Sequence, residues 1–256
     1  MKKIVIALLL LSQIAVANPG QDQGDFYELR IYHAETNEQI SALDNYLKSA
    51  FLPALHSNGV KKVGVFKQLG IDTAADKTIY VFIPYSSVED WAKTNKKVAA
   101  DKTFLENGRS FTHASSEKPP FKRMETILME AFSGQQHMVI PPKQPGRLYE
   151  LRSYESPTEN LHDKKVAMFN TGGEIPLFNR LGFDPVFYAR VVAGNKMPNF
   201  MYMPIFESEE QRSAQWKRFG QDSVWIDISS RPENENKVSV SHIDSILLLA
   251  TEYSDI

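Results

Sequence analysis

Two stretches of the chain read alike: Phe26-Tyr27-Glu28-Leu29-Arg30-Ile31-Tyr32 and Leu148-Tyr149-Glu150-Leu151-Arg152-Ser153-Tyr154. The shared Tyr-Glu-Leu-Arg recurs after 122 positions, and later landmarks keep almost the same separation. Leu52-Pro53 returns as Ile175-Pro176 after 123 positions, and Asp101 returns as Asp222 after 121 positions. A period maintained over this length indicates an internal repeat whose loops carry small insertions or deletions.

The repeat divides the chain into two homologous halves. We predict the first half over residues 25–132 and the second over residues 147–256. Residues 133–146 between them contain Pro141, Pro142 and Pro145, a composition typical of a semi-rigid, extended linker.

Each half is predicted to follow the order β-α-β-β-α-β. The opening stretch alternates with a period of two, as a strand with two unlike faces does. Helix-capping residues mark the starts of the helices at Thr36 with Gln39, Ser87, Ser156-Pro157-Thr158-Glu159 and Ser208. Pro53 and Pro176 are expected to kink or end the first helix of each half. Further strands are expected at 63–67, 79–83, 124–132, 185–192, 200–205 and 243–253.

This order forms a four-stranded antiparallel sheet with both helices on one face, the ferredoxin-like arrangement. The other face carries aromatic and aliphatic side chains, which are unfavourable in contact with water. Two copies in one chain can cover these faces by packing them together. We therefore predict an α+β fold of two tandem ferredoxin-like (βαββαβ) repeats packed as a pseudo-dimeric α/β barrel.

The duplicated opening strand and one further motif carry a family resemblance. The motif is Trp216-Lys217-Arg218-Phe219-Gly220-Gln221-Asp222-Ser223-Val224-Trp225, in the second helical region of the second half. Together they resemble the NIPSNAP family, which implies the dimeric α/β-barrel superfamily. The resemblance also implies that tandem secreted members of the NIPSNAP family have no established reaction. The first half departs from the motif, because residues 99–104 keep Asp101 but lack the leading Trp-x-x-Phe.

The candidate ligand-binding residues follow from the alternation of the opening strands. If Tyr27, Leu29 and Ile31 pack on the helices, the intervening residues point into the space between the two sheets. These residues are Glu28, Arg30, Tyr32, Glu150, Arg152 and Tyr154. Two interpretations remain open: the Glu-Arg pairs stabilise the sheet, or the arginines line a pocket for a carboxylate or other anionic ligand.

Tyr80 and Tyr202 are interpreted as matching strand positions that either add hydrogen bonds to this pocket or lie half-buried in the core. His33 ends a strand and is the best single candidate for a proton-transfer group or an axial haem ligand, beside the alternative of a solvated loop histidine.

Several kinds of chemistry are excluded or unsupported. The chain has no cysteine, which excludes disulfides, thiolate metal sites and cysteine nucleophiles. The six histidines show no metal-ligand spacing, so no metal site is predicted. Hydrolase and nucleotide-binding motifs are absent. No cofactor is required by the sequence, and haem remains a possibility.

The first 17 residues read as a cleavable signal peptide, with Lys2 and Lys3, an apolar run and a small-residue site ending at Ala17. We expect a periplasmic or secreted protein with a short flexible tail at residues 18–24. Without the two lysines the chain has 27 basic and 31 acidic residues. This balance argues against nucleic acid or an anionic membrane as a partner.

Three functions remain open. The first is a binding module that holds a small, anionic or aromatic ligand between its two sheets. The second is an enzyme of the dimeric α/β-barrel type, either a cofactor-independent or a haem-dependent oxygenase or isomerase. The third is a structural or interaction protein with a filled barrel. A monomer is sufficient to cover both sheets, and a homo-oligomer is compatible with the sequence.

Overall fold

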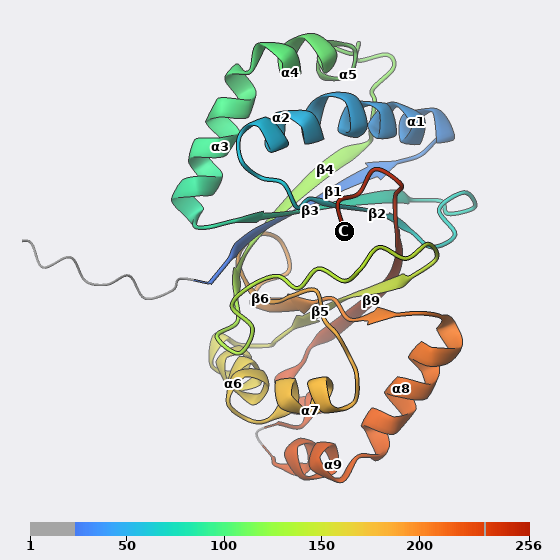
Figure 1. Ribbon diagram of the computed structural model, residues 1–256. Coiled ribbons are helices and arrows are strands. Elements are labelled where there is room, and N and C mark those ends of the chain that lie inside the picture. Colours follow the sequence, from blue (N-terminus) through green and yellow to red (C-terminus); the bar gives the residue numbers. More distant parts are fainter. Residues whose placement is uncertain (1–23, 233) are drawn as a thin grey trace, which may run out of the picture.

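A computed structural model describes residues 24–232 and 234–256, which form two similar halves around one barrel (Figure 1). The predicted signal peptide and all of the predicted tail except Gly24 lie outside the described residues. The helices of the first half cover one side of the barrel, and those of the second half cover the opposite side.

The first half contains four strands and two helical regions, as predicted. Its elements are β1 (Phe26–Ala34), α1 (Asn37–Tyr46), the π-helical turn η1 (Leu47–Phe51), α2 (Leu52–Ser57), β2 (Gly64–Gln68), β3 (Lys77–Tyr85), α3 (Val88–Ala100), α4 (Lys102–Asn107), α5 (Arg109–Thr112) and β4 (Arg123–Ala131).

The second half repeats this order. Its elements are β5 (Leu148–Glu155), α6 (Glu159–Asn170), α7 (Glu174–Arg180), β6 (Tyr188–Ala193), β7 (Asn199–Tyr202), β8 (Ile205–Phe206), α8 (Glu209–Gln221), α9 (Ser223–Ser230), α10 (Asn236–Ser239) and β9 (His242–Ala250).

The strands close into a barrel that confirms the predicted fold class. Within the first half the order is β4-β1-β3-β2, and within the second half it is β9-β5-β7-β6, with all pairs antiparallel. β2 pairs with β9, and β4 pairs with β6. Both edges of each four-stranded sheet are therefore paired with the other half, which removes exposed sheet edges.

The predicted orientation of the opening strands is wrong. Tyr27 and Leu29 belong to the hydrophobic cluster inside the barrel, and Ile31 packs against it. Glu28, Arg30 and Tyr32, and their counterparts Glu150, Arg152 and Tyr154, face the helices instead. The alternation correctly separates two faces. Since both faces of each strand are buried, hydrophobicity alone cannot tell which one the helices cover.

Aromatic rings fill one part of the barrel interior. The ring of Phe82 lies 4.4 Å from that of Phe187 and 4.9 Å from that of Tyr27, measured between centroids. Met138 and Ile140 of the linker also pack against this interior cluster. This part of the space between the sheets is consequently packed with side chains.

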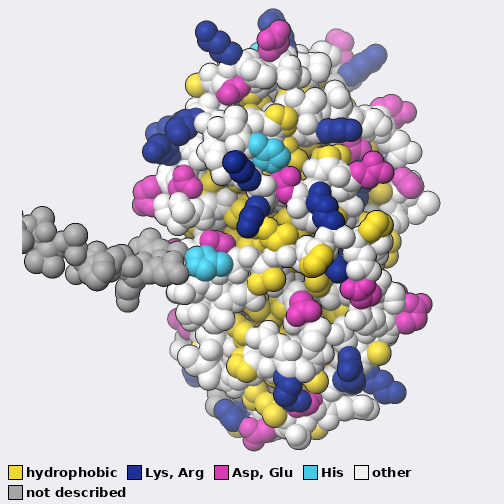
Figure 2. Space-filling view, in the orientation of Figure 1, with side chains coloured by type: hydrophobic (Ala, Val, Ile, Leu, Met, Phe, Trp, Pro, Cys, Tyr) yellow, Lys and Arg dark blue, Asp and Glu magenta, His cyan; other side chains and the backbone are white. Residues whose placement is uncertain are grey.

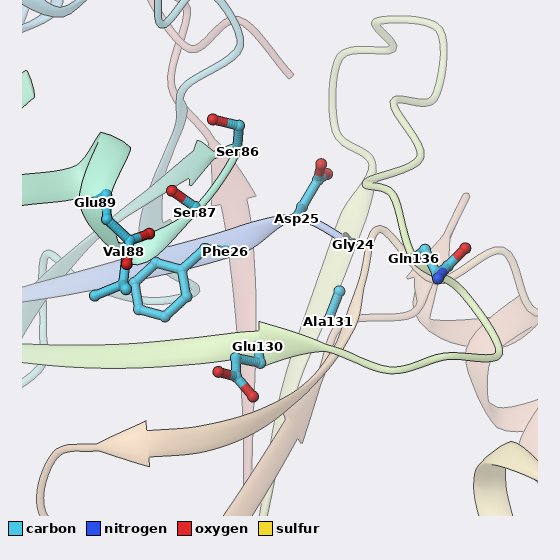
Figure 3. Close-up of a pocket in the computed structure, with 10 residues that line it drawn as sticks. All are labelled: Gly24, Asp25, Phe26, Ser86, Ser87, Val88, Glu89, Glu130, Ala131 and Gln136. Atoms are coloured by element: carbon cyan, nitrogen blue, oxygen red, sulfur yellow. The ribbon is translucent and has the colours of Figure 1, made fainter. Parts of the chain in front are cut away.

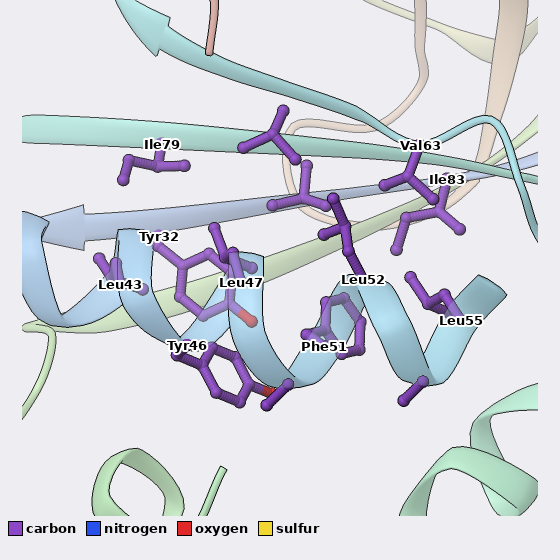
Figure 4. Packing of buried hydrophobic residues seen from close by; sticks show 14 of the residues in the cluster. Tyr32, Leu43, Tyr46, Leu47, Phe51, Leu52, Leu55, Val63, Ile79 and Ile83 are labelled. Atoms are coloured by element: carbon purple, nitrogen blue, oxygen red, sulfur yellow. The ribbon is translucent and has the colours of Figure 1, made fainter. Parts of the chain in front are cut away.

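Each helix layer packs on the outer face of its own sheet, as Figure 4 shows for α1, η1 and α2. The capping box of Thr36 with Gln39 is present as predicted. Pro53 does not end the first helical region, because it lies in the first turn of α2, directly after the π-helical turn η1. Pro176 lies in the first turn of α7, and α6 has already ended at Asn170. The cap of α6 is Thr158, whose hydroxyl accepts from Leu161 N, rather than Ser156.

On the face seen in Figure 2, hydrophobic side chains show in the band between the two helix layers, and charged side chains are scattered over both halves. Among the described residues, the helices are too short or too polar to cross a bilayer.

Candidate ligand pocket at one end of the barrel

The Glu-Arg pair of the first half links its sheet to α3. Glu28 Oε2 accepts hydrogen bonds from Trp91 Nε1 at 2.9 Å and from Tyr85 OH at 3.2 Å. Arg30 pairs with Glu28 and donates to Asn95 Oδ1 at 2.7 Å. The carboxylate and its arginine thus form a cross-link beneath the helix layer.

The equivalent Glu-Arg pair of the second half includes a second arginine, Arg212. Glu150 is fully buried and pairs with Arg152. Its oxygens accept from Arg212 Nε at 2.7 Å, Trp216 Nε1 at 2.8 Å and Ser245 Oγ at 2.6 Å. Burial alone would raise the pKa of Glu150, but the hydrogen bonds from Arg212 and Ser245 and the charge of Arg152 lower it to about 2.

The two tyrosines interpreted as equivalent lie on opposite faces. Tyr202 is paired with Arg152 in the sheet, whereas Val81 is the residue paired with Arg30. Tyr202 faces the helices, and Tyr80 faces the barrel interior. The prediction fails because the two halves differ by one residue before this strand, and a shift of one residue reverses the face.

A cavity of about 510 Å³ opens at one end of the barrel, between the two sheets. Its apolar lining comes from both halves: Ile31, Tyr80, Ile127, Leu151, Met201 and Ile246. Its polar lining comprises His33, Gln68, Asp76, Thr78, Arg123, Glu125, Ser153, Asn195, Lys196, Asn199 and Asp244. Of the predicted site residues, the structure brings only Tyr80 and His33 to this cavity. An apolar interior with polar groups at its edge is typical of small-molecule sites.

His33 lies between two carboxylates at the edge of the cavity. Its Nδ1 is 2.8 Å from Asp76 Oδ2, and its Nε2 is 3.1 Å from Glu125 Oε1. The Nε2 contact lacks hydrogen-bond geometry, so this nitrogen is buried without a hydrogen-bond partner. The carboxylate on Nδ1 orients the ring, and Nε2 is held against the carboxylate of Glu125.

The charges at the rim nearly balance. Lys196 Nζ lies 2.7 Å from Asp244 Oδ2, and Arg123 pairs with Glu125. Burial, opposed by a hydrogen bond with Thr78, raises the pKa of Tyr80, so its phenol stays protonated at neutral pH. The arginines that suggested an anionic ligand, Arg30 and Arg152, lie outside this cavity.

His33 does not fit the role of an axial haem ligand, because both ring nitrogens face carboxylate oxygens. Among the described residues, Glu155, His242 and Asp244 place three possible metal-ligand atoms within 4.8 Å of one another. The ammonium group of Lys196 already binds Asp244 there, and His242 Nε2 lies 2.9 Å from its other oxygen. Neither observation supports a resident metal or haem.

A larger cleft, of about 730 Å³, lies beside the first described residues (Figure 3). Acidic residues and a helix cap dominate its lining, with Asp25, Ser87, Glu89 and Glu130. There Asp25 Oδ2 accepts a hydrogen bond from the backbone N–H of Met138 at 2.8 Å. This cleft holds none of the predicted site residues and lacks the apolar floor of the cavity at the barrel end.

The sequence reasoning missed most of the polar rim. Asp76 lies in the loop before β3, and Asn195 and Lys196 lie in the loop before β7. No periodic pattern extends into such loops. Glu125 and Ser153 lie on strands, and correct assignment of the inward face would have identified both.

The fold and the cavity define a closed α/β barrel of the dimeric α/β-barrel type, with both halves in one chain. Residues 149–255 match the NIPSNAP family model, so the second half of the chain carries a NIPSNAP domain. No match was found among curated proteins.

Solved structures share the whole barrel. A candidate monooxygenase from Lactobacillus acidophilus is 9% identical, with a TM-score of 0.57 over 89% of this chain and 94% of that one. An anthrone oxidase-like protein is 11% identical, with a TM-score of 0.58 over 90% of this chain and 93% of that one. Similarity at this level of identity shows a common fold.

Proposed function

We propose that the protein binds a small, mainly apolar ligand in the cavity at the end of its barrel, between the two sheets. The observation that carries this proposal is an apolar floor from both halves beneath a polar rim, in a cavity of about 510 Å³. The ligand places its apolar or aromatic body on Ile127, Leu151 and Met201. A hydroxyl or carbonyl group then meets the rim at Tyr80 and His33.

Native mass spectrometry of the protein purified from its natural host tests this proposal. We expect a co-purified small molecule, and its addition to stripped protein should raise the unfolding temperature. At about 100 times the dissociation constant, a ligand stabilises by about 2.7 kcal/mol.

A pair of substitutions on β9 locates the site. Ile246 lines the cavity, whereas Ile243 on the same strand is 38% exposed outside it. Ile246→Trp should fill the cavity and abolish binding, and Ile243→Trp should leave it unchanged. Retention of the ligand by Ile246→Trp would contradict the proposal.

A second function, cofactor-independent oxygenation, is favoured by the placement of His33. With Asp76 on Nδ1 and Glu125 against Nε2, the ring can take up a proton that the Glu125 carboxylate removes from a bound carbon acid. The assay is oxygen uptake with an anthrone, which O₂ converts to the anthraquinone and water. His33→Gln should lower turnover at least 100-fold, and equal rates in the variant and the wild type would exclude this function.

We also propose that the chain is exported and cleaved after Ala17. This proposal is supported by the order of the N-terminal residues: two lysines, then an apolar run, then a small-residue cleavage site. N-terminal sequencing of the protein from a fractionated host should begin at Asn18 in the periplasmic or extracellular fraction. An intact Met1 there would contradict cleavage.

A further inference from the structure

The helix-side core of the second half contains ionisable groups where the first half is apolar. The N-caps Thr36 and Thr158 align the two first helices, so Lys165 is equivalent to Leu43. Glu174 precedes Ile175-Pro176, as Phe51 precedes Leu52-Pro53. Lys165 and Glu174 are only 2% and 4% exposed, so both halves bury these positions.

The strands show the same difference. Tyr188 pairs with Tyr202, which pairs with Arg152. The equivalent series in the first half is Val65 with Val81, which pairs with Arg30. Two phenols therefore replace two valines on the helix side of the second sheet.

Several of these groups have unused hydrogen-bonding capacity. Glu174 Oε2 and Tyr188 OH are buried without a hydrogen-bond partner. Lys165 donates to Asn236 Oδ1 at 2.9 Å, and the ion pairs of the described residues do not include one between Lys165 and Glu174. Burial raises the pKa of Glu174 to about 7 against the opposing charges of Lys165 and Arg152.

Folding does not explain this arrangement. Burying a charge without a close partner, or a polar atom without a hydrogen bond, is strongly unfavourable. The first half reaches the same fold with Leu43 and Phe51, which are almost fully buried. Groups that weaken a fold and are not needed for it are typical of functional sites.

We infer that Lys165, Glu174 and Tyr188 form a second ligand site, between the second sheet and its helices, for a small aromatic anion. Lys165 supplies the positive charge, and Tyr188 and a protonated Glu174 supply hydrogen-bond donors for a carboxylate or phenolate. The aromatic neighbours of these groups are Trp225, whose ring centroid lies 5.9 Å from Lys165 Nζ, and Phe178, whose ring centroid lies 6.1 Å from that of Tyr188. The site is distinct from the barrel cavity, which lies on the opposite face of the same sheet.

Titration of the protein with salicylate, followed by tryptophan fluorescence, tests the inference. We expect saturable quenching in the wild type. Lys165→Leu, which installs the residue of the first half, should raise the dissociation constant at least tenfold. It should also raise the unfolding temperature, because it removes a buried charge. The matched control is Lys164→Leu, at the exposed neighbour on α6, which should change neither quantity.

Tyr188→Phe provides a second test that removes one unpartnered atom. It should keep the stability of the wild type and weaken salicylate binding by about tenfold, the effect of one hydrogen bond to a charged group. Ile246→Trp in the barrel cavity should leave salicylate binding unchanged.

Three results would overturn the inference. One is a wild type that does not bind salicylate, and another is equal affinity in Lys165→Leu. The third is a Lys165→Leu chain less stable than the wild type, which would make the lysine structural.

Discussion

Tyr202 and Val81 occupy equivalent positions in the two halves, because each is paired with the arginine of the first strand of its sheet. Tyr202 OH lies 3.3 Å from Tyr154 OH, which accepts from Arg152 at 2.8 Å. Val81 offers no polar atom in its side chain. The halves therefore share a backbone but differ in the chemistry beneath their helices, and substitutions at equivalent positions should differ in effect.

Glu150→Gln should lower the free energy of unfolding by about 3 kcal/mol, because the amide cannot neutralise Arg152 and Arg212. Urea unfolding followed by circular dichroism measures this loss. Glu28→Gln should lower the free energy of unfolding by less, since the Glu28 carboxylate pairs with one arginine, Arg30, rather than with two. The control is Glu209→Gln, at an exposed partner of Arg212, with a change below about 0.5 kcal/mol. A Glu150→Gln chain as stable as this control would contradict the cross-link.

Stability should fall in acid because of Glu150. Its pKa is about 2 in the folded chain and 4.5 as the ordinary value, so the unfolded chain binds more protons in between. The stabilisation is complete above pH 4.5 and is lost as the pH falls towards 2. The difference in unfolding free energy between wild type and Glu150→Gln should shrink over this range. A constant difference would disagree with the lowered pKa.

His162 should add a second acid-sensitive contribution. Burial, followed by the charge of Arg190, lowers its pKa from 6.5 to about 4. Between these values the unfolded chain takes up a proton that the folded chain does not, so stability falls as the pH decreases. His162→Ile, with the residue found at Ile40, should remove this loss. Titration of the imidazole by NMR should give a midpoint near 4, and a midpoint above 6 would be incompatible with burial.

Phe187→Ala should destabilise the barrel by about 4 kcal/mol, because the ring is fully buried between Tyr27 and Phe82. Chemical denaturation measures the effect. Leu105→Ala, at a side chain that is 45% exposed, should change stability by less than about 1 kcal/mol. Similar losses in the two variants would argue against a packed barrel interior.

Asp222→Ala should lower stability by about 1 kcal/mol through loss of a helix cap. Asp222 Oδ1 accepts from Val224 N at 2.9 Å and from Arg180 at 2.8 Å. Asp101→Ala is the matched change, since Asp101 caps α4 through Phe104 N at 2.8 Å. Thermal unfolding should show a somewhat larger loss of stability for Asp222→Ala than for Asp101→Ala, because Asp222 also accepts from Arg180. No loss of stability in either variant would exclude the capping role.

The repeat, the strand and helix order and the barrel could be predicted from the sequence. These depend on local signals, such as the capping box of Thr36 with Gln39, and on the spacing of Tyr-Glu-Leu-Arg. The orientation of the strands could not, because in a barrel covered by helices both faces of each strand are buried. The equivalence of Tyr80 and Tyr202 failed for a related reason, since sequence offset does not reveal a one-residue change of register.

By itself, the sequence determined two copies of one fold, and it left open whether Glu28 and Glu150 pair with Arg30 and Arg152 or whether the arginines bind a ligand. The tertiary structure decided that each glutamate pairs with its arginine beneath the helices, and it brought His33, Asp76 and Glu125 together at the barrel end. It also placed Lys165 and Glu174 beneath the second helix layer. Local patterns act over a few residues, whereas a binding site is assembled from strands and loops distant in sequence, whose meeting depends on the closure of the whole barrel.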